Sequence, residues 1–242
     1  MPENQNLKDL AELPWRHKLA IAMIGSTNNG TIILDIGCGE FALLERYLIS
    51  RNCTVVALDL NVQALHKAKS LIQVGAPTNV NFIQAAATAL PLKQHSIDKL
   101  VMLEVIEHLG LNREEAALKE CSRVSKHGGT LVLSTPNYCL LANLLDPHWL
   151  LGHRHYKQQT LKEKIVGSSF RLERTLVRGG MISAFGYIVY LPWHLIWSHL
   201  VQRSTEPPFP FQRYLCKLSA QEFLTEQRRL GTTIFLRAVK DH

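Results

Sequence analysis

Cysteine is scarce in this chain, and its spacing excludes two kinds of site. The five cysteines among 242 residues are Cys38, Cys53, Cys121, Cys139 and Cys216. They include no C-x-x-C pair and no even framework, so the sequence offers neither a zinc-thiolate site nor a disulfide scaffold. We therefore expect reduced thiols and a cytoplasmic protein.

Acidic residues are also in the minority. Asp and Glu number 20 against 27 Lys and Arg, which gives a formal net charge of +7 and an isoelectric point near 9.2. The basic residues are spread along the chain, so they do not predict a nucleic-acid partner, whereas affinity for an anionic membrane surface stays open. Residues 1–18 are polar and mixed in charge, and we expect no secretory signal in them.

Charge is absent altogether from residues 179–202, which contain no Asp, Glu, Lys or Arg. The stretch is as long as the roughly 20 residues that a membrane-spanning helix needs, but Pro192, His194 and His199 interrupt it. Its tryptophans and tyrosines favour a membrane interface. Three interpretations stay open: a lid over a substrate pocket, an element in peripheral contact with a membrane, and a span. A span is disfavoured because both flanks are expected in one sheet.

The most informative motif that is present is a glycine turn at residues 35–39, Asp-Ile-Gly-Cys-Gly. It follows the apolar run 31–34, and Asp59 ends a second apolar run at 54–58. An apolar strand, a tight glycine turn and an acid about twenty residues further on are typical of a nucleoside-binding half of a doubly wound α/β domain. Cys38 meets the need for a small residue in the turn, so we interpret it as structural.

Asp35 decides which nucleoside is expected. The pattern Gly37-x-Gly39-x-x-Ala42 also fits the dinucleotide fingerprint of a dehydrogenase. However, a carboxylate beside a helix N-terminus would repel a pyrophosphate, whereas S-adenosylmethionine carries an ammonium and a sulfonium that a carboxylate attracts. The turn resembles the first motif of the class I S-adenosylmethionine-dependent methyltransferases, which has the form acid-x-Gly-x-Gly.

The hydrophobic pattern predicts alternating strands and helices. Strands are expected over residues 31–35, 54–58, 79–84, 97–103, 130–134, 171–177 and 232–239. Helices are expected over residues 14–25, 40–50, 62–73 and 112–125. Together with the resemblance, this alternation predicts an α/β fold: a doubly wound, mostly parallel, seven-stranded Rossmann-like methyltransferase sheet with an apolar insertion late in the chain. We divide the chain into a helical lead-in (1–30), a cofactor-binding core (31–136) and a substrate-recognition elaboration with the closing strands (137–242).

Later stretches resemble the same family in the same order. Residues 82–92 resemble its third motif, residues 96–100 the approach to its fourth strand, and residues 121–137 its turn and fifth strand. The resemblance implies cofactor contacts from Asp35, Gly37, Cys38, Gly39, Asp59, Leu60, Ala87 and Glu104. Ala86 departs from the family, because many members place there an acid that binds the adenine amino group. The missing acid would lose one charge-assisted hydrogen bond, worth about 1.5–3 kcal/mol. A catalytically inactive S-adenosylmethionine-binding protein is therefore an alternative interpretation.

Residues 104–108, Glu-Val-Ile-Glu-His, follow the fourth expected strand and form the second informative cluster. Methyl transfer requires that the acceptor be positioned and lose a proton, and histidine titrates in the range that suits this task, so His108 is the expected catalytic base. The cluster resembles those of ubiquinone-pathway O-methyltransferases and of 2′-O-methyltransferases that act on small-RNA 3′ ends. That resemblance implies a divalent cation (magnesium, manganese or zinc) held by residues among Glu104, Glu107, His108, His153 and His155.

The expected function is methyl transfer from S-adenosylmethionine to an oxygen of a hydrophobic, small-molecule or lipid-like acceptor, such as a prenylated phenol. The charge-free residues 179–202 and the cluster at 104–108 both favour it. RNA 2′-O-methylation is the alternative. The net positive charge favours RNA, but residues 179–202 offer no positive surface for phosphates.

Overall fold

The computed structural model of the protein describes residues 14–49, 51–72, 79–139, 143, 153–180 and 231–241. The chain divides into two compact units. The first comprises residues 1–134, 159–175 and 235–242, and the second comprises residues 135–158 and 176–234. The apolar insertion and its expected membrane contact concern residues 179–202, of which 181–202 lie outside the described residues.

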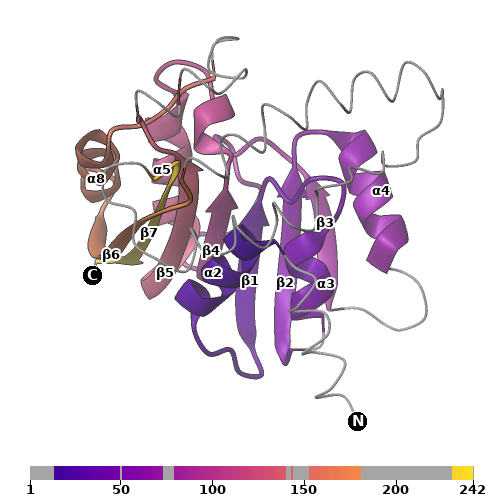
Figure 1. Ribbon diagram of the computed structural model, residues 1–242. Helices are drawn as coiled ribbons and strands as arrows, with labels where there is room; N and C mark the ends of the chain where they lie inside the picture. Colours follow the sequence, from indigo (N-terminus) through magenta and orange to yellow (C-terminus); the bar gives the residue numbers. More distant parts are fainter. Residues whose placement is uncertain are drawn as a thin grey trace, which may run out of the picture. The chain divides into compact units, whose positions relative to one another are not determined.

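In the described part of the chain, seven strands form one sheet (Figure 1). They are β1 (Thr31–Ile36), β2 (Cys53–Asp59), β3 (Val80–Gln84), β4 (Ile97–Leu103), β5 (Ser125–Pro136), β6 (Phe170–Arg178) and β7 (Thr233–Lys240). Their order across the sheet is β3-β2-β1-β4-β5-β7-β6. Parallel ladders join β1 to β2, β1 to β4, β2 to β3 and β4 to β5. The strand order reverses at β1 and β4, and such a switch point is where doubly wound sheets bind their ligands.

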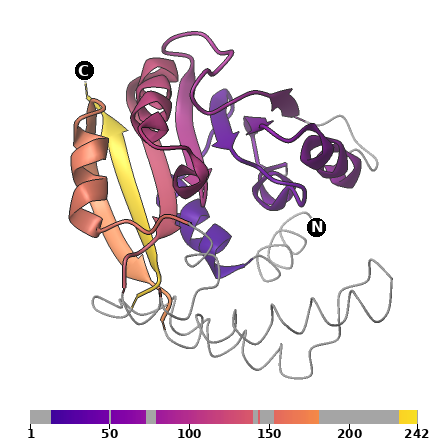
Figure 2. The ribbon, with the colours of Figure 1, turned by 90° about the horizontal axis from the view of Figure 1, so that it is seen from above.

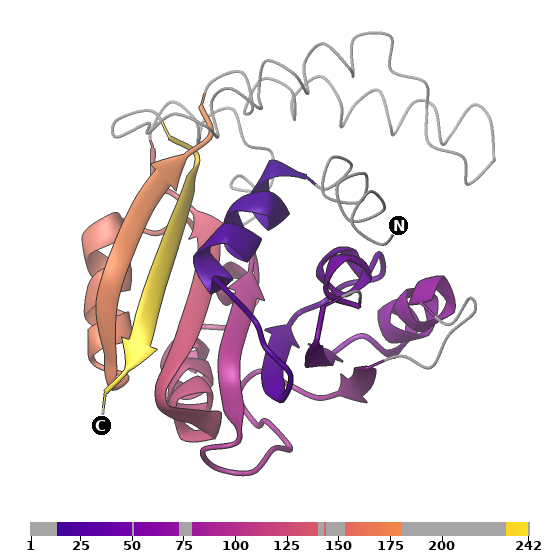
Figure 3. The same ribbon diagram turned by 90° about the horizontal axis from the view of Figure 1, so that it is seen from below.

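Helices cover both faces of this sheet. The described helices are α2 (Trp15–Ile24), α3 (Leu43–Leu48), α4 (Val62–Ile72), α5 (Arg113–Val124) and α8 (Gln158–Val166), with the short 3-10 helix η1 (Ile106–His108). α2, α3 and α4 lie on one face and α5 and α8 on the other, with α8 alongside β6 and β7 (Figures 2 and 3). None of the helices in these residues is both long and apolar enough to span a membrane.

The central strands are buried on both faces, which is why their sequences read as unbroken apolar runs. Leu34 of β1, Leu100 of β4 and Leu131 of β5 are completely buried. Phe170 and Phe235, on β6 and β7, close the core on its other side and are also completely buried. Because β1 pairs in parallel with both β2 and β4, the residues just beyond these three strands lie at one edge of the sheet.

The structure confirms the α/β fold and every strand and helix expected from the sequence, with shifts at their ends. The helix expected over 40–50 begins only at Leu43, because Ala42 has a left-handed backbone with φ 47°. β5 begins at Ser125 instead of Thr130, because the residues between them form an irregularity opposite β4. Neither α8 nor η1 was expected. α8 buries only two side chains, Leu161 and Ile165, and η1 spans three residues.

Candidate functional site

The glycine turn after β1 is shaped by contacts that exclude a side chain. Gly37 has φ 79°, and a Cβ atom there would lie 2.3 Å from Cγ2 of Val105. The amides of Gly37 and Cys38 both donate to the Leu58 carbonyl, at 2.7 and 3.1 Å. The left-handed backbone and the close approach together require glycine at this position. Because Val105 directly precedes η1, the turn and η1 are immediate neighbours.

Gly39 borders open space and is held by Asp59. Its φ is 66°, and a Cβ atom there would have no other atom within 4 Å. The Asp59 carboxylate accepts hydrogen bonds from the amides of Gly39 (2.9 Å) and Asn61 (2.8 Å), one on each oxygen. A carboxylate offers about four acceptor sites, so the group can still accept from ribose hydroxyls. Leu60, 69% exposed between Asp59 and Asn61, adds an apolar surface beside them.

Asp35 at the end of β1 is paired with a second acid, Glu45 on α3. Asp35 is 5% exposed and Glu45 is completely buried. The pKa of Asp35 is raised to about 6, mainly by burial. A hydrogen bond with Glu45 lowers this pKa, and the charge of Asp59 raises it by a smaller amount. Burial and then the Asp35 charge raise the pKa of Glu45 well above its usual range. Both shifts favour the protonated form of these two carboxyls over the ionised form.

Cys38 lies within this acidic surrounding. Burial first, and then the carboxyl groups of Glu45, Asp35 and Asp59, raise the pKa of the Cys38 thiol far above its usual range. Since the thiolate is the reactive form of cysteine, this thiol is inert as a nucleophile. The residue acts as a small member of the turn.

The residues after β3 provide backbone and apolar surface near the end of β2. The amide of Ala85 donates to the Asp59 carbonyl at 3.1 Å, and the side-chain amide of Gln84 donates to the Leu60 carbonyl at 3.2 Å. Ala87 is buried. The Ala86 carbonyl accepts from the amide of Ala89 at 3.0 Å, within a tight turn. This segment is therefore tied to the Asp59 corner by hydrogen bonds.

Glu104, just beyond β4, is bound by groups of the chain itself. Its backbone is left-handed, with φ 55°. The hydroxyl of Ser134 donates to Oε1 of Glu104 at 2.7 Å, and the amide of Glu104 donates to the Ser134 carbonyl at 3.0 Å. Nη1 of Arg16 on α2 lies 3.9 Å from Oε2 of Glu104. The carboxylate thus bridges β5 and α2 within the first unit.

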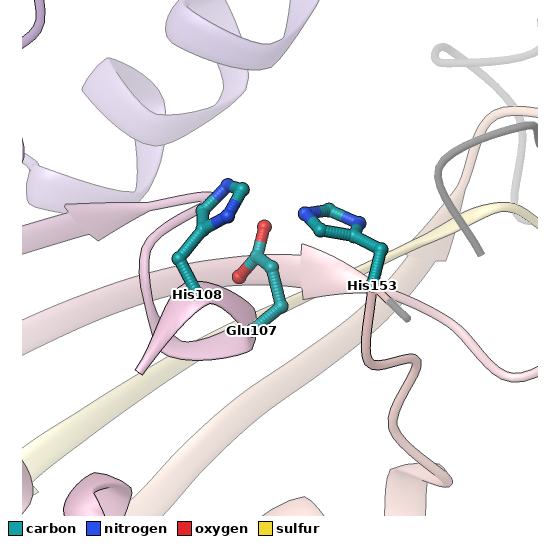
Figure 4. Close-up of side chains that lie close together, drawn as sticks. All are labelled: Glu107, His108 and His153. Carbon is teal, nitrogen blue, oxygen red and sulfur yellow. The ribbon is translucent and has the colours of Figure 1, made fainter. Parts of the chain in front are cut away.

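Glu107 and His108 follow on η1, and Figure 4 shows both side chains. Glu107 is 3% exposed, whereas His108 is exposed. The amide of His108 donates to the Val105 carbonyl at 3.0 Å, which closes the single turn of η1. η1 therefore presents an exposed imidazole one helical turn after Val105, the residue that limits Gly37.

His153 and His155 belong to the second unit. Their rings face each other edge-on, with centroids 6.1 Å apart. Nδ1 of His155 lies 2.6 Å from Oδ1 of Asn143, and the next residue, Tyr156, forms a parallel bridge with Asn137. The hydrogen bond and the bridge orient this segment within its own unit.

Sequence reasoning missed three residues that complete these clusters: Glu45, Arg16 and Ser134. Glu45 lies in a short helix next to Arg46, a pattern that is typical of a solvent-facing position, and so carried no signal. Arg16 and Ser134 are far from Glu104 in the chain, and no local pattern links them to it. All three residues could be identified only from their contacts in the folded structure.

The residues around the glycine turn fit S-adenosylmethionine and oppose a dinucleotide. A carboxylate of Asp35 beside the turn would repel a pyrophosphate and attract a cation. The open space at Gly39 leaves room for a ligand. Asp35 would hold the cationic end, Asp59 the ribose and Leu60 the adenine, and the bound cofactor supplies an electrophilic methyl group.

Comparisons with known proteins agree with this geometry. Residues 34–133 match the family described as a methyltransferase domain. The chain is 26% identical over 189 residues to the ubiquinone/menaquinone biosynthesis C-methyltransferase UbiE of Azotobacter vinelandii, covering 66% of this chain and 74% of that protein. It is 29% identical over 136 residues to the ubiquinone biosynthesis O-methyltransferase of Nitrosomonas europaea, covering 55% of this chain and 56% of that protein.

A solved structure shows the same fold. Phosphoethanolamine N-methyltransferase 2 of Haemonchus contortus, in complex with S-adenosyl-L-methionine, aligns with a TM-score of 0.65 at 16% identity, over 94% of this chain and 52% of that one. The matched residues 34–133 run from within β1 to within β5 and include the glycine turn, Asp59 and η1. Residues 34–133 of the chain are a methyltransferase domain of the S-adenosylmethionine-dependent class.

Proposed function

We propose that this methyltransferase transfers its methyl group to an oxygen of a hydrophobic, small-molecule or lipid-like acceptor, with His108 as the general base. The observation that supports the proposal is the close approach of Val105 to Gly37, since Val105 directly precedes the segment that carries His108. His108 is exposed on that segment. A base at this position is within reach of an acceptor hydroxyl that lies beside the methyl group.

Relatives and sequence together suggest the class of acceptor. Two relatives carry ubiquinone biosynthesis in their names. Residues 179–202 contain no charged Asp, Glu, Lys or Arg side chain, which suits a lipid-like molecule and peripheral contact with a membrane. A phenol or quinol with a prenyl chain meets both indications. RNA is the less favoured acceptor, because those residues carry no cation for phosphate.

Carbon methylation is the second candidate, since the relative from Azotobacter vinelandii is named as a C-methyltransferase. Removing the proton of a phenol spreads negative charge over the oxygen and the neighbouring ring carbons. The same base, His108, therefore serves either product. Which atom attacks depends on how the pocket orients the ring against the methyl group.

We extend the proposal to a divalent cation, magnesium or zinc. Glu107 and His108 of the first unit, drawn in Figure 4, offer a carboxylate and an imidazole, and we name His153 of the second unit as a further imidazole donor; zinc and other divalent ions accept donors of these kinds. An ion held there would act as a Lewis acid on the acceptor hydroxyl. Glu104 and His155 are hydrogen-bonded to Ser134 and Asn143, and we give them a supporting role.

The test is an assay with methyl-deuterated S-adenosylmethionine and two acceptors, a dihydroxybenzene bearing a prenyl chain and a short RNA. We expect label in the prenylated phenol, and the NMR spectrum of the product distinguishes a methoxy group from a ring methyl. A chelator arm, followed by re-addition of magnesium or zinc, tests the cation. Label in the RNA alone would overturn the hydrophobic acceptor, and undiminished turnover in chelator would overturn the metal.

A further inference from the structure

The connection between β3 and β4 is a long loop whose main chain is held by side chains of α5. Residues 85–96 form this connection, and no helix lies within them. The two strands are not neighbours in the sheet, because β2 and β1 lie between them. Loops are ordinarily more mobile than the elements that they connect. The main chain of this loop therefore stays in one place only if other groups hold it.

The groups that hold it belong to one ion pair on α5, between Arg123 and Glu120. Nη1 and Nη2 of Arg123 donate to the carbonyls of Leu92 and Leu90, each at 2.9 Å. Oε2 of Glu120 accepts from the amide of Leu90 at 2.8 Å. Two hydrogen bonds, of 2.7 and 2.8 Å, join the guanidinium to the carboxylate, and the hydrogen bond from Arg123 lowers the pKa of Glu120. The ion pair thus binds both the amide and the carbonyl of Leu90, with the bidentate geometry that makes such pairs strong.

This ion pair is a fixed anchor because α5 is itself packed into the core. Four side chains of the helix are completely buried: Ala117, Leu118, Cys121 and Val124. An ion pair between residues three apart on a helix stabilises that helix only slightly. Here most of the hydrogen bonds of the pair lead to the main chain of the loop. Holding the loop is therefore the larger contribution of Arg123 and Glu120.

The other end of the loop borders the place where the base of the cofactor is expected. Asp59 at the end of β2 is the acid expected to bind the ribose hydroxyls, and the adenine base is attached to that ribose. The amide of Ala85 donates to the Asp59 carbonyl at 3.1 Å, so the loop begins directly beside this acid. Residues 85–87 are all alanine. The hydrogen-bonding groups that they offer to a base are therefore peptide groups alone.

The anchor on α5 reaches these alanines through one tight turn. The amide of Ala89 donates to the Ala86 carbonyl at 3.0 Å, and the next residue along the chain is Leu90. The six residues 85–90 are consequently tied at one end to β2 and at the other end to α5. Loss of the second tie would leave the alanines attached to the sheet at one end only.

We propose that Arg123 and Glu120 position the main chain of residues 85–90 for recognition of the adenine base of the cofactor. A peptide group cannot turn toward a ligand as a side chain can, so it distinguishes bases only where the backbone is held to within about 0.5 Å. Arg123 and Glu120 are positioning residues that act through the loop. The inference rests on the binding of S-adenosylmethionine by the methyltransferase domain, and is independent of the acceptor and of any metal.

The decisive measurement is the choice between two bases. S-inosylhomocysteine differs from S-adenosylhomocysteine in that a carbonyl and a ring N–H replace the adenine amino group and a ring acceptor. Calorimetry gives the Kd of each ligand, and we expect the wild type to bind the adenine ligand about tenfold more tightly or better. In Arg123→Ala this ratio should fall to about threefold or less, because the peptide groups of residues 85–90 are no longer held in one direction.

Arg237→Ala is the matched control. Arg237 on β7 likewise bonds a carboxylate, that of Glu173 at 2.9 Å, and likewise donates to a main-chain carbonyl, that of Met23. We expect both variants to lose stability in urea unfolding, but Arg237→Ala should keep the wild-type ratio of the two Kd values. Hydrogen exchange of the amides of residues 85–90 should be faster in Arg123→Ala and unchanged in Arg237→Ala.

An unchanged ratio in Arg123→Ala, or the same fall in both variants, would overturn the proposal. Equal binding of the two ligands by the wild type would overturn it as well. If Arg123→Ala does not fold, Arg123→Lys decides: it keeps the charge without the planar fork, and its ratio should lie below that of the wild type. Failure of the prenylated phenol as acceptor would leave this inference intact, because no titration contains an acceptor. If S-adenosylhomocysteine does not bind to the wild type, the inference fails, whatever the acceptor assay shows.

Discussion

Two acidic corners lie at the same edge of the sheet, and they differ in how their charge is balanced. At the ends of β1 and β2, burial and neighbouring acids raise the pKa of Asp35 and Glu45, and no Lys or Arg among the described residues is a cause of either shift. At the end of β4, Glu104 is bound by Ser134 and has Arg16 beside it. The acids of the first corner would favour a positive ligand, whereas the carboxylate of the second corner has partners from its own chain.

The two corners are held together by one close approach. Val105, between Glu104 and η1, occupies the space that a side chain at Gly37 would need. The acid pair at the proposed cofactor corner and the imidazole proposed as the base are therefore joined through two residues in contact. Variants that disturb the contact between Gly37 and Val105, or that change a side chain in one corner only, test this arrangement.

The largest effect is expected from His108→Ala, which removes the base and leaves the acidic corner intact. Turnover of the acceptor should fall by about 10²–10⁴-fold, while the Kd of S-adenosylhomocysteine stays within about twofold, since the residues proposed to bind the cofactor are unchanged. Steady-state kinetics and calorimetry provide the two numbers. His66→Ala, a change at an exposed histidine of α4, is the control. Turnover that survives in His108→Ala would refute the catalytic role.

Gly37→Ala should break the connection between the corners. The new methyl group would meet Val105 at 2.3 Å, and the left-handed backbone adds roughly 1–2 kcal/mol of strain. We expect binding of S-adenosylhomocysteine to weaken by about 100-fold or more, since the turn must move away from Val105.

Two comparisons isolate the steric cause of that loss. Gly128→Ala changes a glycine with a similar φ of 72° but with no atom within 4 Å of a new Cβ, and it should lose stability without losing affinity. Gly37→Ala combined with Val105→Ala removes the obstructing methyl group and should recover part of the binding. Equal losses in Gly37→Ala and Gly128→Ala would show that backbone strain alone is responsible.

His17 sharpens the contrast, because it lies on α2 beside Arg16, the cation of the second corner. Burial first, and then the Arg16 charge, lower the pKa of His17 to about 4. Below pH 6.5 the unfolded chain takes up a proton that the folded protein refuses, so this residue removes stability as pH falls from 6.5 to about 4, by up to about 3 kcal/mol. His17→Gln should flatten this fall in urea unfolding measured across that pH range.

The acidic pair acts in the opposite direction over part of the same range. The raised pKa of Asp35, about 6, means that its contribution to stability is complete below pH 3.8 and is lost as pH rises through 6. Both proteins contain the acidic pair, so its contribution cancels when the free energy of unfolding of His17→Gln is subtracted from that of the wild type at each pH. A difference that does not change with pH would contradict the assignment of a buried neutral imidazole.

The smallest effect is expected from Ser134→Ala, which removes the hydroxyl bound to Glu104 at 2.7 Å. Losing a hydrogen bond to a charged group costs about 1.5–3 kcal/mol, and we expect the lower end because Arg16 stays beside the carboxylate. Urea unfolding measures the loss. Ser96→Ala, which removes a hydroxyl bonded to the Lys93 carbonyl on the surface, should change the free energy of unfolding by less than about 0.5 kcal/mol. Equal values for the two variants would show that Glu104 does not depend on Ser134.

Much of the fold followed from local patterns. The strand before Asp35, the turn at Gly37 and Gly39, and the strand that ends at Asp59 were all predicted, because each depends on neighbours along the chain. The start of α3 was not, since Ala42 adopts a left-handed backbone that sequence alone does not favour. The residues proposed for the site, His108 above all, stay predictions until they are tested by mutation.

By itself the sequence determined the α/β alternation, the family and the corner at which the cofactor is expected. Short-range rules decide these features: an apolar run buries a strand, a glycine permits a left-handed turn, and a carboxylate at a strand end selects a cation over a phosphate. Only the tertiary structure decided that Glu45 joins Asp35, that Arg16 and Ser134 bind Glu104, and that Val105 requires Gly37. Each of these pairs has members on different elements, and packing of the sheet and its helices brings them together.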